Sequence, residues 1–227
     1  MKETNQPIKK LNSSRWILSA ATAKKTLLFT ALFLVVFLVW VVFIYGRNSF
    51  DQSAFLLIGP YTTETRTALM RFISFLGKHT FLIPAIILLI GFFLYRKNKW
   101  MAIRTTTVLL SSLLLMSLLK TLIKRKRPPD PLVEGITNFS FPSGHAFMSV
   151  AFYGLLIWFS SVYIRDKWTR RIITFFLLLI IAGIGFSRIY LRVHYATDVI
   201  AGICFGFLWL DFCLWFIDKK EAALTKK

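Results

Sequence analysis

Long hydrophobic stretches alternate with short polar segments along most of this chain. Six of these stretches carry few or no charges: Thr26 to Tyr45, Thr80 to Tyr95, Thr105 to Leu119, Gly144 to Ile164, Ile172 to Ser187, and Val199 to Ile217. A helix of about 20 residues, rising roughly 1.5 Å per residue, crosses the ~30 Å hydrocarbon core of a bilayer. The second, third and fifth stretches are shorter and need flanking residues. The pattern predicts an all-α polytopic membrane protein with six transmembrane helices.

Composition supports a membrane protein. The chain has 227 residues, of which 56% are hydrophobic and 16% aromatic, and its mean hydropathy is +0.61. These values exclude a soluble domain of this size. No small-x-small cleavage pattern follows the first stretch, so we expect an uncleaved anchor. Cys204 and Cys213 are nine residues apart on one expected helix, on roughly opposite faces, which predicts no disulfide between them and no zinc site.

The net charge of +19 would suit a nucleic-acid partner, but the positions of the charges indicate a membrane topology instead. In the six-span layout, 18 of the 29 Lys and Arg residues precede the first span, follow the sixth, or lie between spans two and three or four and five. The positive-inside rule then places both termini in the cytoplasm. We therefore expect a cytoplasmic segment over residues 1–25, a six-span domain over 26–217 and a cytoplasmic tail over 218–227.

The longest polar insertion, Gly46 to His79, has apolar residues at helical spacing. Leu69, Phe72 and Ile73 would share one face of a helix. This spacing predicts a short interfacial helix in the first outer loop, with its apolar face in the headgroup region. The segment is then either a connector docked on the bundle or a lid that guides a lipid substrate to the site.

Ionisable residues at the outer ends of the spans form three short blocks. Charged groups beside hydrocarbon are costly, so such residues are functional candidates. The alternative for the basic cluster is a solvated loop or a contact with lipid headgroups. The blocks are Lys120 to Arg127 followed by Pro128, then Pro142-Ser143-Gly144-His145, then Ser187-Arg188 with His194 and Asp198.

The third block pairs an imidazole with a carboxylate. His194 and Asp198 are four residues apart and share a face if both lie on the helix of the sixth span. A carboxylate that accepts a hydrogen bond from one ring nitrogen fixes the tautomer and raises the basicity of the other. This pair is therefore a candidate nucleophile or general base with its orienting group.

The same pair suggests a metal site as an alternative, with His145 and His79 as further ligands. Neighbouring cations would repel a divalent metal, whereas a phosphate needs them. These cations are Lys120, Arg127 and Arg188. We therefore expect a phosphate site without a metal or other cofactor.

The second block predicts an anion site at the start of a helix. Ser143 is a good N-cap for the fourth span, and Gly144 leaves the backbone amides open to phosphate oxygens. His145 would lie in the first turn beside the bound anion. That position suits a general acid that protonates a departing oxygen.

The first block supplies cations. Lys120 and Arg127 are seven residues apart, about two turns, and lie on one side if the helix continues to Pro128. An arginine fork and a lysine point charge together suit a tetrahedral phosphate. The run from Lys124 to Lys126, which includes Arg125, is expected to be solvated or to face headgroups.

The three blocks together resemble the three-part signature of the type 2 phosphatidic acid phosphatase superfamily, over Lys120 to Asp198. The resemblance implies a metal-independent reaction in which His194 attacks phosphorus, Asp198 orients it, and His145 protonates the leaving group. It also implies that the phosphate is held by Lys120, Arg127, Ser143, Gly144 and Arg188.

The resemblance implies an integral membrane lipid phosphatase, and the charge pattern puts its site on the extracytoplasmic face of the plasma membrane. Candidate substrates are phosphatidylglycerophosphate, phosphatidic acid and undecaprenyl diphosphate, which the motifs do not separate. The expected partners are this lipid and the surrounding membrane lipids, not nucleic acid. The oligomeric state is left open. Alternatives are a lipid or anion transporter, which needs more polar groups within the spans than Ser, Thr and Asp211, or an inactive lipid-binding member of the family.

Overall fold

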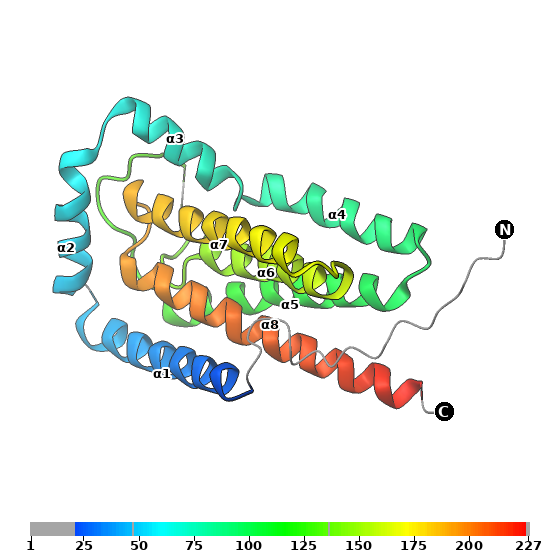
Figure 1. Cartoon of the computed structure of the whole chain (residues 1–227). Helices are drawn as coiled ribbons and strands as arrows, with labels where there is room; N and C mark the ends of the chain where they lie inside the picture. The colour runs from blue at the N-terminus through cyan, green and yellow to red at the C-terminus, as the bar shows by residue number, and fades with distance from the viewer. Residues whose placement is uncertain (1–20, 47, 136, 226–227) are drawn as a thin grey trace.

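The computed structural model describes residues 21–225 except 47 and 136. Within these residues the chain is helical and contains no strand. Its elements are α1 (Ala21–Tyr45), α2 (Ser49–Ile58), the 3-10 turn η2 (Gly59–Tyr61), α3 (Glu64–Phe75), α4 (His79–Tyr95), α5 (Lys99–Ile123), α6 (Gly144–Tyr163), α7 (Lys167–Tyr190) and α8 (Ala196–Leu224). Figure 1 shows α5 to α8 lying side by side, with α2 crossing one end of the bundle.

The prediction of an all-α membrane protein is confirmed, because six segments are long and apolar enough to cross a bilayer. They coincide with the six expected stretches and extend several of them. The second segment, Glu64–Tyr95, includes α3 as well as α4. The expected insertion at 46–79 therefore forms two short α-helices, and its place at the membrane interface stays a prediction.

The structure describes only part of the two expected terminal segments. Most of the basic segment 1–25 lies outside the described residues, as do the last two residues of the tail 218–227. Helix α8 continues to Leu224, so most of the expected tail is helical. Cys204 and Cys213 are buried free thiols.

Helix α6 is the centre of the bundle, because most of its side chains are buried and it packs against α5, α7 and α8. Small residues on α8 allow a close approach to α6. A Cβ on Gly202 would lie 2.7 Å from the carbonyl oxygen of Ser143, and one on Gly206 would lie 2.8 Å from that of Phe147. Close helix contacts of this kind are typical of membrane bundles. The contact brings the start of α6 against the first turns of α8.

Replacement of Gly202 by Ala should destabilise the bundle by about 1–3 kcal/mol, because the added methyl group meets backbone that cannot move independently of α6. Gly91, in α4, is the matched control, since a Cβ there meets nothing within 4 Å. Thermal unfolding in detergent should show a lower Tm for Gly202→Ala and little change for Gly91→Ala. Equal Tm values for the two variants would contradict this packing argument.

Candidate active site

The three sequence blocks meet at one end of the bundle, where α5 and α7 end and α6 and α8 begin. Two backbone hydrogen bonds hold the connections there. The Ser143 amide donates to the Asp198 carbonyl at 3.0 Å, and the Ser140 amide donates to the Arg125 carbonyl at 2.8 Å. Residues separated by more than fifty positions in the chain therefore form one site.

His194 and Asp198 are in contact, but not on one helix as expected. Helix α8 begins at Ala196 after the N-cap residue Tyr195, so His194 precedes the helix. The Asp198 side chain folds back to accept the Tyr195 amide at 2.9 Å. This capping turn leaves Nδ1 of His194 3.5 Å from Oδ2 of Asp198.

The other ring nitrogen of His194 faces a cation. Its Nε2 lies 3.2 Å from Nη1 of Arg127, while Oγ of Ser140 lies 3.4 Å from Nδ1 and also donates to Asp198. The His194 side chain is only 1% exposed. Burial lowers the pKa of His194 to about 3, although the hydrogen bond to Asp198 acts in the opposite direction. The imidazole is therefore neutral at physiological pH, as a nucleophile requires.

Lys120 and Arg127 converge, although the helix that was expected to carry both ends too early. Helix α5 ends at Ile123, and Lys124 adopts a left-handed conformation with φ of 51°. Lys120 nevertheless donates to the Phe139 carbonyl at 2.5 Å, and Nη2 of Arg127 lies 3.4 Å from the same oxygen. Burial lowers the pKa of Arg127 to about 10, which leaves it charged at neutral pH. The shared carbonyl brings both cations to one place.

Arg188 and His145 belong to the same cluster. Arg188 is buried in the last turn of α7 and donates from Nη1 to Oγ of Ser74, while its Nε has no hydrogen-bond partner among the described residues. His145 interacts electrostatically with Arg188, His194 and Arg127. A Cβ on Gly77 would lie 3.4 Å from its ring, so the turn before α4 packs against this histidine.

Ser143 occupies the expected N-cap position of α6, but its side chain does not cap the helix. Its hydroxyl is buried and makes no hydrogen bond to any described residue. Next to it, a Cβ on Gly144 would lie 3.6 Å from Cε of Lys120. The start of α6 thus combines an unpartnered hydroxyl and a nearby lysine with the positive end of a helix, a setting that favours anions.

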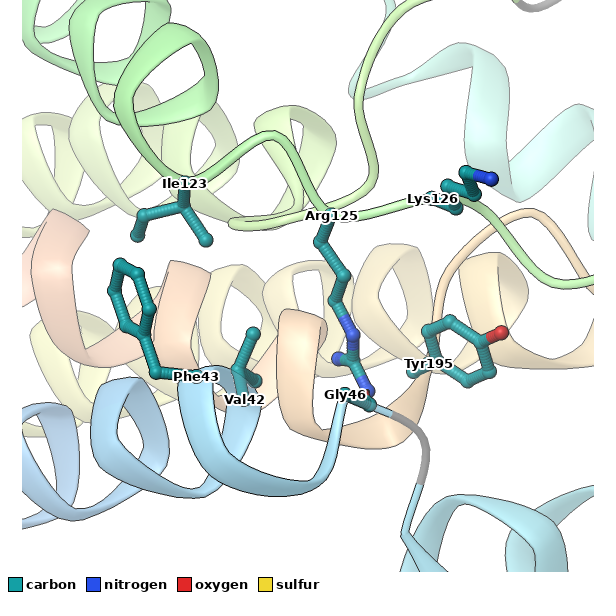
Figure 2. A pocket seen from close by; sticks show the side chains of 7 residues that line it. All are labelled: Val42, Phe43, Gly46, Ile123, Arg125, Lys126 and Tyr195. Carbon is teal, nitrogen blue, oxygen red and sulfur yellow. The ribbon is translucent and has the colours of Figure 1, made fainter.

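Sequence reasoning missed Arg125, which was expected to be solvated or to face headgroups. The structure corrects this, because Arg125 is buried at 7% exposure between two carboxylates. Figure 2 shows its side chain extending from the α5–α6 connection to Gly46, beside Tyr195. It borders a pocket of about 380 Å³ lined by Val42, Phe43, Gly46, Ile123, Arg125, Lys126 and Tyr195.

Asp51, Ser140 and Thr197 were also missed. Asp51 is an acidic residue within the apolar helix α2, which is the one signal that pointed to a buried role. Ser140 and Thr197 belong to common residue types without a distinctive spacing. For the alternative of a metal site, residues 21–225 without the two gaps contain no group of three or more His, Cys, Asp or Glu side chains arranged to hold an ion.

The sequence of this chain is similar to one known protein family and to two known phosphatases. Residues 101–222 match the PAP2 superfamily. Phosphatidylglycerophosphatase B of Bacillus subtilis is 33% identical over 79% of this chain and 87% of its own length. An undecaprenyl-diphosphatase of Sulfolobus acidocaldarius is 28% identical over 72% of this chain and 76% of its own length.

Solved structures agree on the fold. A transmembrane PAP2-type phosphatidylglycerolphosphate phosphatase from Bacillus subtilis aligns with a TM-score of 0.74 and 26% identity, covering 85% of this chain and 96% of its own. LpxE from Aquifex aeolicus shares the fold with a TM-score of 0.61 at 24% identity, over 76% of this chain and 99% of its own. The chain therefore belongs to the PAP2 superfamily and is a membrane lipid phosphatase.

Proposed function

We propose that this protein hydrolyses the phosphate headgroup of phosphatidylglycerophosphate, through a phosphohistidine formed on His194. The observation that carries the mechanism is the placement of the two ring nitrogens, with Nδ1 facing Asp198 and Nε2 facing Arg127. With the proton on Nδ1 facing Asp198, the lone pair of Nε2 is directed towards Arg127, one of the cations that would bind the phosphate. The similarity to phosphatidylglycerophosphatase B supports the substrate, and undecaprenyl diphosphate is the second candidate.

In the proposed first step, Nε2 of His194 attacks phosphorus, and the bond between phosphorus and the lipid oxygen breaks. His145 donates a proton to that oxygen, which leaves as the lipid alcohol. In the second step His145 takes a proton from water, whose oxygen attacks phosphorus and releases phosphate from His194. Asp198 stabilises the imidazolium character that develops at His194.

The phosphate oxygens would be held by Lys120, Arg127 and Arg188, with the hydroxyl of Ser143 and the amide of Gly144. Two of these groups have donors without a partner among the described residues, namely the Ser143 hydroxyl and Nε of Arg188. Charge-assisted hydrogen bonds from fixed donors stabilise the phosphoryl transition state. No step in this scheme requires a metal ion.

We further propose that residues 26–217 form the phosphatase domain, that both termini are cytoplasmic, and that the site lies on the extracytoplasmic face. The distribution of Lys and Arg supports this orientation. The membrane lipids surround the bundle in this arrangement. A lid role for residues 46–79 stays a prediction.

The His194→Ala variant should lose phosphate release by roughly 10³-fold or more, because the scheme then lacks its nucleophile. Purified protein is assayed in detergent with EDTA, and the phosphoenzyme is trapped as an acid-labile, base-stable adduct. The wild type should form the adduct and His194→Ala should not. Activity of the wild type only with added divalent metal, or a folded His194→Ala variant that retains activity, would contradict the mechanism.

The His145→Ala variant should slow turnover of the lipid by about 10²–10⁴-fold, because the leaving alcohol then departs without a proton. An aryl phosphate with a good leaving group needs no proton, so it should still phosphorylate His194. Phosphoenzyme formation from the two substrates checks this expectation. An equal loss with both substrates would argue against a general-acid role.

Given equal concentrations of phosphatidylglycerophosphate, phosphatidic acid and undecaprenyl diphosphate, the enzyme should show its highest kcat/KM for the first. The assay measures each product by mass spectrometry in mixed micelles. Faster hydrolysis of undecaprenyl diphosphate would contradict this assignment and make undecaprenyl diphosphate the proposed substrate.

Cysteine labelling in intact cells tests the orientation. Glu134 is exposed in the α5–α6 connection, and Lys167 is exposed at the start of α7, beyond the other end of α6. Glu134→Cys should react with a membrane-impermeant maleimide, whereas Lys167→Cys should react only after the membrane is opened. The reverse result would invert the topology.

A further inference from the structure

Arg125 connects the catalytic carboxylate to a second, remote carboxylate. Its Nη1 donates to Oδ1 of Asp198 at 2.5 Å, and its Nη2 donates to Oδ2 of Asp51 at 2.7 Å. Nη2 also donates to the Gly46 carbonyl at 2.5 Å. A single guanidinium therefore joins the end of α1, helix α2 and the first turn of α8.

Asp51, like Asp198, is a fully buried carboxylate with several hydrogen-bond donors. It is 0% exposed, and its Oδ1 accepts the Thr197 amide at 2.9 Å and the Thr197 hydroxyl at 3.0 Å. Thr197 directly precedes Asp198, and its hydroxyl also accepts from Nη1 of Arg125 at 2.7 Å. Asp51 thus restrains the first turn of α8 through the backbone and side chain of Thr197. Arg125 restrains the same turn through the side chains of Thr197 and Asp198.

The two oxygens of Asp198 have separate roles in this arrangement. Oδ2 accepts from Ser140 and the Tyr195 amide and faces His194, whereas Oδ1 is held by Arg125. Rotation of the carboxylate about its side-chain bond would move both oxygens together. The Arg125 contact therefore fixes the direction in which Oδ2 meets the imidazole.

The groups around Arg125 are buried, so the loss of any one of them would disturb the others. The Arg125 guanidinium also lies over the Tyr195 ring, 4.1 Å from its centroid, in a cation–π contact. Removal of one partner from a buried ion pair leaves an uncompensated charge that pulls the remaining groups out of place. A displacement of about 1 Å in a catalytic group can reduce the rate by about 10²-fold.

We propose that Arg125 and Asp51 are positioning residues that fix the Asp198 carboxylate against His194 and couple helix α2 to the active site. This inference rests on the proposed function, because its readout is the phosphoryl-transfer step. Neither Arg125 nor Asp51 is among the residues that we assign to phosphate binding. Their effect should fall on kcat and on phosphoenzyme formation, with KM little changed.

The test compares Arg125→Gln, Arg125→Lys, Asp51→Asn and the double variant Asp51→Asn/Arg125→Gln in the full-length protein, with phosphatidylglycerophosphate in mixed micelles. Arg125→Gln should lower kcat by about 10- to 100-fold and change KM by less than about threefold. Arg125→Lys should recover part of the loss because it restores the charge. The loss in the double variant should be smaller than the two single losses combined, since Asp51 and Arg125 pair with each other and both contact Thr197.

Arg104 provides the matched control at the other end of α5. It is likewise buried and pairs with two carboxylates, Asp218 at 2.6 Å and Glu221 at 2.5 Å. Arg104→Gln should lower the Tm but leave kcat per folded molecule unchanged. Arg125→Gln should lower both.

The outcomes separate the two proposals. Equal kcat values for wild type and Arg125→Gln, with only the Tm reduced as in Arg104→Gln, would overturn the positioning role and leave the proposed function intact. If Arg125→Gln fails to fold, Arg125→Lys and Asp51→Asn carry the test, and wild-type kcat in both would overturn the inference. A wild type inactive on every lipid phosphate would contradict the proposed function and this inference with it.

Discussion

The burial of one carboxylate, that of Asp198, organises this end of the molecule. A buried carboxylate needs donors at both oxygens, because an unpaired charge in a low-dielectric interior is very costly. The donors are Ser140 and Arg125, both in the α5–α6 connection, and the Tyr195 amide in the turn before α8. By satisfying Asp198, the chain also assembles the elements that carry His194, Arg127 and the start of α6.

The second constraint is the close approach of α6 and α8. Gly202 lets the two backbones meet where the Ser143 amide donates to the Asp198 carbonyl. The N-terminus of α6 and the first turn of α8 are therefore fixed relative to each other by backbone contacts. Side chains at these two helix ends are therefore held in fixed relative positions. This suits a site that must hold an anion in line with a nucleophile.

The spans and the grouping of the three blocks could be predicted, since hydropathy and residue spacing are local properties of the chain. The path of the backbone between Ile123 and Gly144 could not, because a left-handed residue at Lys124 redirects it and leaves Arg127 off the helix. For the same reason Arg125 looked like a solvated member of a basic run. Its partner Asp51 lies 74 residues away, and only tertiary structure brings such a pair together.

The Ser143 hydroxyl, buried and unpartnered among the described residues, has a consequence for ligand affinity. Folding has already removed this group from water, and that free-energy cost, about 1–3 kcal/mol for an unsatisfied buried group, is borne before any ligand arrives. An incoming oxyanion that accepts from this hydroxyl would recover part of that cost. Tetrahedral oxyanions should therefore bind to a preorganised surface, and their binding free energy should favour the folded state.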